Sequence, residues 1–312
     1  MGPLGGSEPQ EMTDDEPASL VNKWRRRFAR LAVLVVVLGL VLSWLVGGEL
    51  VSSKPSVVGE IPDDLAGESL TLKSESGSAL AAWHIKAKTN DPRGVVVLLH
   101  PLGFPRKTML GRVRMLVNAN YACLLFDFQA HGESPGDVVT FGSLEKHDVV
   151  AGVACAKALY SDKPVGVIGW SLGGAAALLA SPLDVDALVL EAVYSDIEEA
   201  VTNRVAMFLG PLAWLPSQLL LLQVKPRLGV STADLRPIDH VGDVKCPVFV
   251  VGGEADRRTP ATETQEMFEA VTSTKELWLV PGADHVDFHK YAKAEYERRV
   301  LAFFANHLKR SR

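Results

Sequence analysis

Residues 169–173 read GWSLG, and this short stretch decides how the surrounding chain is expected to fold. It follows the apolar run VGVI at 165–168 and leads into the small-residue run GGAAA at 173–177, which predicts a strand, a sharp turn and a helix. Glycines on both sides of the turn let the backbones approach and leave Ser171 at the apex in a strained conformation. The hydroxyl of Ser171 then projects at the carboxyl edge of a sheet, and the N–H of Leu172 points out of the start of the helix. The pattern therefore predicts a nucleophilic serine with half of an oxyanion hole beside it.

Apolar runs alternate with stretches of helical spacing through the rest of residues 66–312. Strands are expected at 69–72, 80–85, 95–99, 122–126, 165–168, 187–190, 248–251 and 277–280. Several of these runs are apolar on both faces, as in a parallel sheet that helices cover on both sides. The alternation predicts one doubly wound α/β domain with a mostly parallel sheet of about eight strands.

Residues 195–240 interrupt this alternation with an insert that is too long for an ordinary connection between two strands. It holds the apolar runs VAMFL at 205–209 and WLPSQLLLL at 214–222. Two interpretations stay open: an additional helix that packs on the core, or a short helical cap that lines a substrate pocket.

Residues 31–48 read LAVLVVVLGLVLSWLVGG and carry no charge. At roughly 1.5 Å per residue, such a helix is about 27 Å long, close to the hydrocarbon thickness of a bilayer. The residues just before it include one lysine and four arginines, which places the N-terminus in the cytoplasm and the bulk of the chain outside it. A cleavable signal peptide is the alternative, but the apolar core is long and no A-x-A site follows it.

These features predict four parts of the chain. Residues 1–22 are expected to be a disordered cytoplasmic tail, 23–48 a basic flank and transmembrane anchor, 49–65 a tether, and 66–312 the folded domain. The chain contains no Asn-x-Ser/Thr glycosylation sequence, which favours a bacterial inner-membrane protein whose folded domain faces the periplasm. The 37 acidic residues outnumber the 32 basic ones, which argues against a nucleic-acid partner. Nothing in the sequence indicates an oligomeric state.

A serine hydroxyl becomes a good nucleophile only when a base takes its proton and a carboxylate orients that base. His285 and Asp256 each follow an expected strand, so both are expected at the sheet edge where Ser171 projects. Glu254 and Asp284 are alternative sources of the carboxylate.

A metal site is a further possibility, because Asp287 and His289 lie close to this region of the sequence. The H-E-x-x-H pattern of a zinc hydrolase is absent, so no metal ligand is assigned. We expect neither a metal nor an organic cofactor.

Four motifs together resemble the α/β-hydrolase superfamily. They are LHPLG at 99–103, DFQAHGES at 127–134, GWSLG at 169–173, and the pair of Asp256 and His285. The chain is similar to the branch that contains membrane-anchored α/β-hydrolase-domain proteins, serine aminopeptidase-like enzymes and monoacylglycerol lipases. These motifs span most of residues 65–310, and they specify the fold but no substrate.

The resemblance implies that Ser171 is the nucleophile, His285 the base and Asp256 the residue that orients the base. It also implies that the N–H of Leu102 completes the oxyanion hole. Family members usually carry His-Gly where this chain has His-Pro at 100–101. Because the proline precedes the donor, Leu102 still has an N–H to give.

These roles imply a serine hydrolase that cleaves an ester or thioester through an acyl-enzyme. The apolar insert and the anchor favour a lipid-like or acylated small molecule near the membrane. Two other function classes stay open. An aminopeptidase or amidase would need carboxylates to hold a free amine, for which Glu198 and Glu199 are candidates. A non-catalytic binding protein on the same fold is the other.

Overall fold

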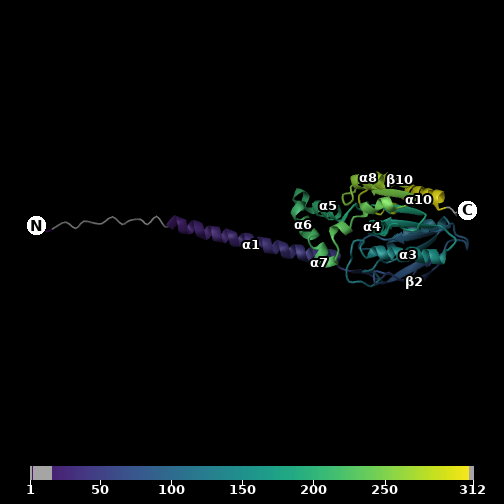
Figure 1. Cartoon of the computed structure of the whole chain (residues 1–312), viewed down its shortest axis with the longest axis horizontal. Coiled ribbons are helices and arrows are strands. Elements are labelled where there is room, and N and C mark those ends of the chain that lie inside the picture. The colour runs from purple at the N-terminus through teal and green to yellow at the C-terminus, as the bar shows by residue number, and fades with distance from the viewer. Residues whose placement is uncertain (1, 3–15, 309–312) are drawn as a thin grey trace. The chain divides into compact units, whose positions relative to one another are not determined.

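The structure is a computed structural model that describes residue 2 and residues 16–308. The chain divides into two compact units, Met1–Val46 and Gly47–Arg312. Helix α1 (Glu16–Val51) begins in the first unit, and its last turn, from Gly47, belongs to the second unit (Figure 1).

Helix α1 begins before the basic flank, so the end of the segment expected to be a disordered tail is helical from Glu16. Pro17 is tolerated there because the first helical turn needs no backbone N–H donor from that residue. The rest of the expected tail, apart from residue 2, lies outside the described residues. Two segments are long and apolar enough to cross a membrane by length and composition, Asn22–Val51 and Ile197–Leu228.

The second unit is built on an eight-stranded sheet with the strand order β10-β9-β8-β7-β4-β5-β3-β2. The strands are β2 (Gly67–Lys73), β3 (Ala79–Ile85), β4 (Val95–Leu99), β5 (Ala122–Phe126), β7 (Val165–Trp170), β8 (Ala187–Glu191), β9 (Val248–Gly253) and β10 (Lys275–Val280). Strands β2 and β3 form an antiparallel hairpin at one edge, β3 pairs antiparallel with β5, and all the other pairs are parallel. The predicted fold class and all eight predicted strands are confirmed.

Helices cover both faces of this sheet, because its strands send alternate side chains to two separate cores. In β4, Val95, Val97 and Leu99 join one core cluster and Val96 and Leu98 join the other. Residues of α3, α4 and α8 belong to the first cluster, and residues of α2 and α10 to the second. The bounds are α2 (Leu110–Asn118), α3 (Glu145–Leu159), α4 (Leu172–Leu179), α8 (Ala261–Ala270), α9 (Phe288–Tyr291) and α10 (Lys293–His307).

The segment expected to be a tether packs onto the domain. Its strand β1 (Lys54–Pro55) pairs with β6 (His131–Gly132), and the N–H groups of Val58 and Gly59 donate to Glu133 Oε1 at 3.0 and 3.2 Å. Because these backbone groups find partners on the domain, the second unit starts at Gly47 and not near residue 66.

The insert forms three short helices, α5 (Ile197–Leu209), α6 (Trp214–Leu221) and α7 (Val224–Leu228). The Asp196 carboxylate caps α5 by accepting a hydrogen bond from the Glu199 N–H at 2.9 Å. Helix α5 ends where Gly210 adopts a φ of +52° and Pro211 follows. Ala200 of α5 packs in the first core cluster, whereas many apolar side chains farther along the insert are exposed. We call residues 195–240 the cap.

Candidate active site

Ser171 lies at the apex of the turn between β7 and α4, with a φ of +50° and a ψ of −111°. A residue other than glycine rarely adopts this conformation, so the turn is strained, as the sequence predicts. Its N–H donates to the carbonyl of Glu191 at 2.7 Å. A side chain at Gly169 would collide with the backbone of Gly174, and one at Gly173 with the backbone of Leu99. The two glycines therefore permit the close packing that holds the turn.

Ser171, Asp256 and His285 follow the parallel strands β7, β9 and β10 of one sheet. The carboxyl ends of parallel strands meet at the same edge, which we call the carboxyl edge. All three residues thus extend from this edge, although they are far apart in the sequence.

The imidazole of His285 is bonded to Asp256, with 2.8 Å between Nδ1 and Oδ2. The Asp256 carboxylate also accepts from the N–H groups of Arg258 and Thr259 at 2.8 and 2.9 Å and from Thr259 Oγ1 at 2.7 Å. Burial by itself raises the pKa of Asp256, but the hydrogen bonds that the carboxylate accepts, first of all the one from His285, outweigh burial and keep the pKa below its ordinary value. The carboxylate therefore accepts, Nδ1 carries the proton, and Nε2 is free to act as a base.

The two alternative carboxylates are bonded elsewhere. Glu254 accepts from the N–H of Gly282 at 3.0 Å, and Asp284 accepts from the N–H of His285 at 2.7 Å and from the Arg257 side chain. Among the described residues, neither is hydrogen-bonded to the ring of His285. Of the three candidate acids, Asp256 is the one that reaches it.

The Ser171 hydroxyl makes no hydrogen bond to any residue that the structure describes, His285 included, and only 3 % of the residue is exposed. Catalytic hydrogen bonds are often long in an unliganded enzyme and shorten when substrate binds. The serine is therefore neither held in another network nor engaged by the base.

The N–H groups of Leu172 and Leu102 have no protein acceptor within the described part of the chain. The side chains of both residues pack in one small apolar cluster together with Ala130 and Val139. Leu172 is the first residue of α4, where a backbone N–H has no partner within the helix. Two neighbouring segments thus each offer a free donor.

His100 fixes the loop that carries Leu102. Its Nε2 accepts from the N–H of Phe128 at 2.9 Å, so Nδ1 carries the proton and donates to the carbonyl of Pro101 at 2.9 Å. Burial lowers the pKa of His100 well below its ordinary value and keeps the ring neutral. Because the peptide is planar, holding the Pro101 carbonyl aims the N–H of Leu102 in the opposite direction.

A buried ion pair below the turn was not predicted from the sequence. Arg112 is fully buried, with its Nη2 at 2.5 Å from Glu191 Oε2 and its Nη1 at 2.9 Å from Asp287 Oδ1. Its guanidinium also lies 5.0 Å from the centre of the Trp170 ring. Arg112 thus connects Trp170 in the strand before Ser171, Glu191, whose carbonyl accepts from the Ser171 N–H, and the loop after His285. Its position on the same face of α2 as Met115 and Leu116 is the sequence signal that could have revealed it.

Thr259 was missed as well, although its hydroxyl contacts both partners of the pair, at 2.7 Å from Asp256 Oδ2 and 3.2 Å from His285 Nδ1. Its position three residues after an aspartate in a loop is typical of an Asx turn, which is a local signal for such contacts.

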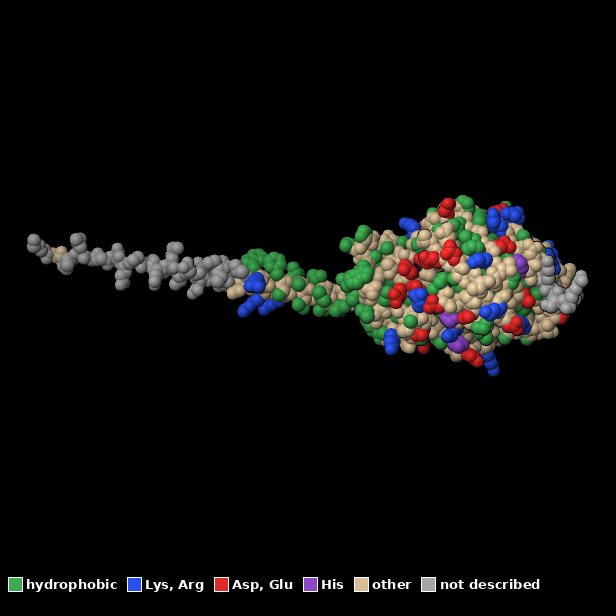
Figure 2. Space-filling view, turned by 45° about the horizontal axis from the view of Figure 1, so that its top comes forward, with side chains coloured by type: hydrophobic (Ala, Val, Ile, Leu, Met, Phe, Trp, Pro, Cys, Tyr) green, Lys and Arg blue, Asp and Glu red, His purple; other side chains and the backbone are tan. Residues whose placement is uncertain are grey.

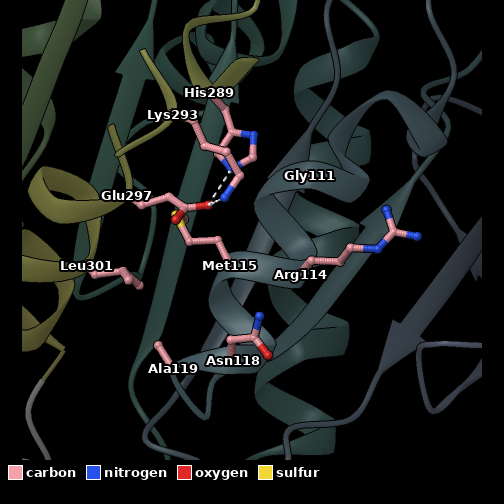
Figure 3. Close-up of a pocket in the computed structure, with 9 residues that line it drawn as sticks. All are labelled: Gly111, Arg114, Met115, Asn118, Ala119, His289, Lys293, Glu297 and Leu301. Carbon is pink, nitrogen blue, oxygen red and sulfur yellow. Dashed lines mark hydrogen bonds and ion pairs between the residues drawn. The ribbon is translucent and has the colours of Figure 1, made fainter. Parts of the chain in front are cut away.

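His289, which was considered as a metal ligand from the sequence, lines a cavity of 430 Å³ between α2 and α10. Figure 3 shows its ring beside Glu297, with 3.0 Å between Nε2 and Oε1, and Lys293 on the same carboxylate at 2.6 Å. This cavity is not lined by Ser171, Asp256 or His285. Across residues 16–308 no three potential ligands gather as a metal ion would require.

Comparison with known proteins gives the same fold. The structure resembles the esterase Pf2001 of Pyrococcus furiosus with a TM-score of 0.68 and 26 % identity, over 82 % of this chain and 99 % of that chain. It resembles acetyl xylan esterase 1 of a Thermoanaerobacterium species with a TM-score of 0.59 and 14 % identity, over 85 % of this chain and 93 % of that chain.

In sequence, the chain is 19 % identical to the uncharacterized protein YqkD of Bacillus subtilis over 240 residues, which are 75 % of this chain and 78 % of that protein. Residues 96–299 match the model of the alpha/beta hydrolase family. This match covers the motifs of the carboxyl edge and most of the sheet, and the protein belongs to the alpha/beta hydrolase family.

Proposed function

We propose that this protein is a serine hydrolase that cleaves carboxylic esters through Ser171, His285 and Asp256. The observation that carries the proposal is the Asp256–His285 pair, joined at 2.8 Å at the same sheet edge as the strained Ser171 turn. The esterase activity named for the similar protein from Pyrococcus furiosus supports an ester over other acyl substrates.

In this mechanism Ser171 Oγ attacks the carbonyl carbon of the ester, and its proton passes to Nε2 of His285. Asp256 stabilises the imidazolium that forms. The negative oxygen of the tetrahedral intermediate accepts hydrogen bonds from the N–H groups of Leu172 and Leu102. His285 then gives its proton to the leaving alcohol, and a water molecule that His285 deprotonates releases the acid from Ser171.

His100 acts as a positioning residue in this scheme. It touches no substrate, but it orients the peptide that carries the Leu102 N–H. The neutral ring suits this role, because a cation beside the oxyanion loop would have to be desolvated.

The substrate we propose is a small acylated or lipid-like molecule at a membrane surface. The apolar helix around residues 31–48 supports an uncleaved anchor with the N-terminus in the cytoplasm and the catalytic domain outside. Fusions of a reporter that is active only in the cytoplasm test this topology. Activity of a C-terminal fusion would reject it.

Labelling with a fluorophosphonate probe tests the chemistry. The wild type is expected to react and Ser171→Ala to lose the label, while Ser217→Ala, a change at another buried serine that donates only within its helix, keeps it. Ester hydrolysis by Ser171→Ala should fall by about 10³-fold or more. Equal labelling of wild type and Ser171→Ala would reject the assignment.

Peptide-bond hydrolysis is the second candidate function. Glu199, Glu263 and Glu266 line a cavity of 420 Å³ beside the cap, and carboxylates of this kind could hold a free amine. A panel of p-nitrophenyl esters of increasing chain length beside aminoacyl p-nitroanilides separates the two. We expect the esters to be cleaved and the longer chains to be preferred. Faster cleavage of the anilides would favour an aminopeptidase, and no turnover of either class would favour a binding protein.

A further inference from the structure

The tip of the cap exposes large apolar side chains to an unusual degree. Residues 205–224 read VAMFLGPLAWLPSQLLLLQV and contain no charge. Phe208 is 85 % exposed, Leu212 78 % and Trp214 70 %. Their neighbours Leu209 and Leu215 are exposed as well. Single exposed apolar residues are common, but a contiguous group of this size marks a surface that contacts another apolar phase.

The group lies where the chain reverses between two short helices. Helix α5 ends at Leu209, the turn passes through Gly210 and Pro211, and α6 begins at Trp214. Figure 1 places α5 and α6 at one end of the second unit, and Figure 2 shows hydrophobic side chains at that end. We call residues 208–215 the cap tip.

The cap tip is too short to cross a bilayer, although Ile197–Leu228 contains a stretch that is apolar enough by composition. Helices α5 and α6 have 13 and 8 residues. At roughly 1.5 Å per residue they are about 20 and 12 Å long, against about 30 Å of hydrocarbon. Both ends of the hairpin return to the same domain, since Ile197 and Val224 belong to one buried cluster. Such a hairpin can enter one leaflet but not both.

The point at which α1 joins the domain identifies the apolar phase. Gly47, Leu50 and Val51 of its last turn line a pocket together with Leu220 and Val224 of the cap. The apolar stretch of α1 ends directly before this turn. The cap is therefore the part of the domain to which the proposed anchor is attached.

We propose that the cap tip inserts into the outer leaflet of the same membrane that α1 anchors to, as a second contact with the lipid. The inference rests on the proposed anchoring and not on the proposed chemistry of Ser171. Phe208, Leu212 and Trp214 would enter the boundary between headgroups and acyl chains, to a depth of about 5–10 Å. The two contacts together would fix the orientation of the domain on the bilayer.

Tryptophan fluorescence of the full chain in vesicles of brominated phosphatidylcholine tests the proposal, because bromine in the acyl chains quenches only at short range. In a Trp24→Phe/Trp44→Phe background, the remaining tryptophans besides Trp214 are Trp83, Trp170 and Trp278, all of which are buried in the domain. We expect quenching relative to unbrominated lipid, and we expect the further change Trp214→Phe to abolish it.

The matched control moves the probe to the opposite edge of the sheet. Leu159 ends α3 and is 40 % exposed, and α3 runs antiparallel to the strands it covers. Leu159→Trp in the background that lacks Trp24, Trp44 and Trp214 should not be quenched. Quenching there as well would mean general adsorption to lipid and would overturn the proposal.

Two double variants test whether contact of the cap tip with lipid affects hydrolysis. Phe208→Ser/Leu212→Ser should reduce quenching and slow the hydrolysis of an ester embedded in vesicles, with unchanged turnover of a water-soluble ester. Phe208→Met/Leu212→Met, which keeps the surface apolar, should behave as the wild type.

Three further results overturn the inference: no quenching of Trp214, equal effects of the serine and methionine pairs, or dimers in detergent that only the serine pair dissociates. The last would assign the surface to a second copy of the chain. Ser171→Ala should be quenched like the wild type, so loss of the proposed chemistry and loss of lipid contact are separate outcomes.

Discussion

The carboxyl edge and the cap tip differ in which side chains they bury and which they expose. At the edge, charged side chains are buried and each is bonded: Asp256 accepts four hydrogen bonds and Arg112 pairs with two carboxylates. At the tip, Phe208 and Trp214 are exposed and pack on little. At the edge, buried hydrogen bonds and ion pairs hold a few polar atoms in place. At the tip, apolar surface is left exposed and can contact another phase. Substitutions should therefore act on chemistry and stability at the edge and on neither at the tip.

The largest effect is expected from Asp256→Asn, which should lower kcat by about 10⁴-fold while the fold is kept. An amide can donate to Nδ1 of His285 and so favours the tautomer whose Nε2 carries the proton. Steady-state ester hydrolysis measures this. Asp284→Asn is the matched control and should change kcat by less than about tenfold. A larger loss in the control than in Asp256→Asn would assign the acid to Asp284.

Removing the buried cation should cost the most stability. Arg112→Met leaves the Glu191 carboxylate buried and uncompensated, which should lower the free energy of unfolding by about 3–5 kcal/mol. Urea denaturation measures it. Arg298→Met, at an exposed pair with Glu295, should stay within about 1 kcal/mol. Replacing both Arg112 and Glu191 by methionine should recover much of the loss, and equal losses for single and double variants would contradict this account.

His100→Ala tests whether the hydrogen bond from His100 to the Pro101 carbonyl positions the loop that carries the Leu102 N–H. Losing the bond to the Pro101 carbonyl should lower kcat by about 10²-fold, with a smaller change in KM, because the N–H of Leu102 acts mainly on the transition state. His147→Ala, at a partly exposed histidine of α3, is the control. If KM rose and kcat stayed constant, the role of His100 would be in binding.

The edge should also make stability depend on pH. Burial raises the pKa of Asp148 to about 6, against the hydrogen bonds from Gln129, Ser74 and Ser76. The folded chain therefore binds this proton more tightly than the unfolded chain does. Between about pH 4 and pH 6 the free energy of unfolding should fall by about 3 kcal/mol from this group, and above pH 6 its effect is constant. The difference between wild type and Asp148→Asn in urea titrations isolates the contribution, and a difference that rises with pH would contradict it.

The smallest effect is expected at the cap tip. Phe208→Ser/Leu212→Ser should change the free energy of unfolding in detergent by no more than about 0.5 kcal/mol per site, because little area is buried there. Leu235→Ala, in the buried cluster at the base of the cap, should cost about 2–5 kcal/mol. A comparable loss at the tip would mean that it packs on the domain, and the contrast between the two regions would disappear.

Local sequence patterns were sufficient to predict the strands and the strained turn. The period of apolar residues and the glycines around Ser171 act over a few residues, and the structure has all eight strands and a φ of +50° at that serine. The position of Asp256 and His285 at one edge follows from the same information, since parallel strands have a common carboxyl end.

Local sequence patterns could not predict contacts between distant segments. Glu254, Asp256 and Asp284 are all close candidates in the sequence, and it was the family resemblance that favoured Asp256. The packing of the loops after β9 and β10 decides which carboxylate reaches His285. The charge of Arg112 is typical of an exposed helix residue. Its burial depends on the ion pairs with Glu191 and Asp287, which come from distant segments.

By itself the sequence determined the α/β architecture, the turn at Ser171 and the apolar stretch of α1, because each depends on neighbouring residues. The tertiary structure decided the partner of His285, the docking of residues 52–59 on the domain and the exposure of the cap tip. Those properties depend on which surfaces meet when the chain closes, and the free energy of such contacts belongs to pairs of segments and not to either one alone.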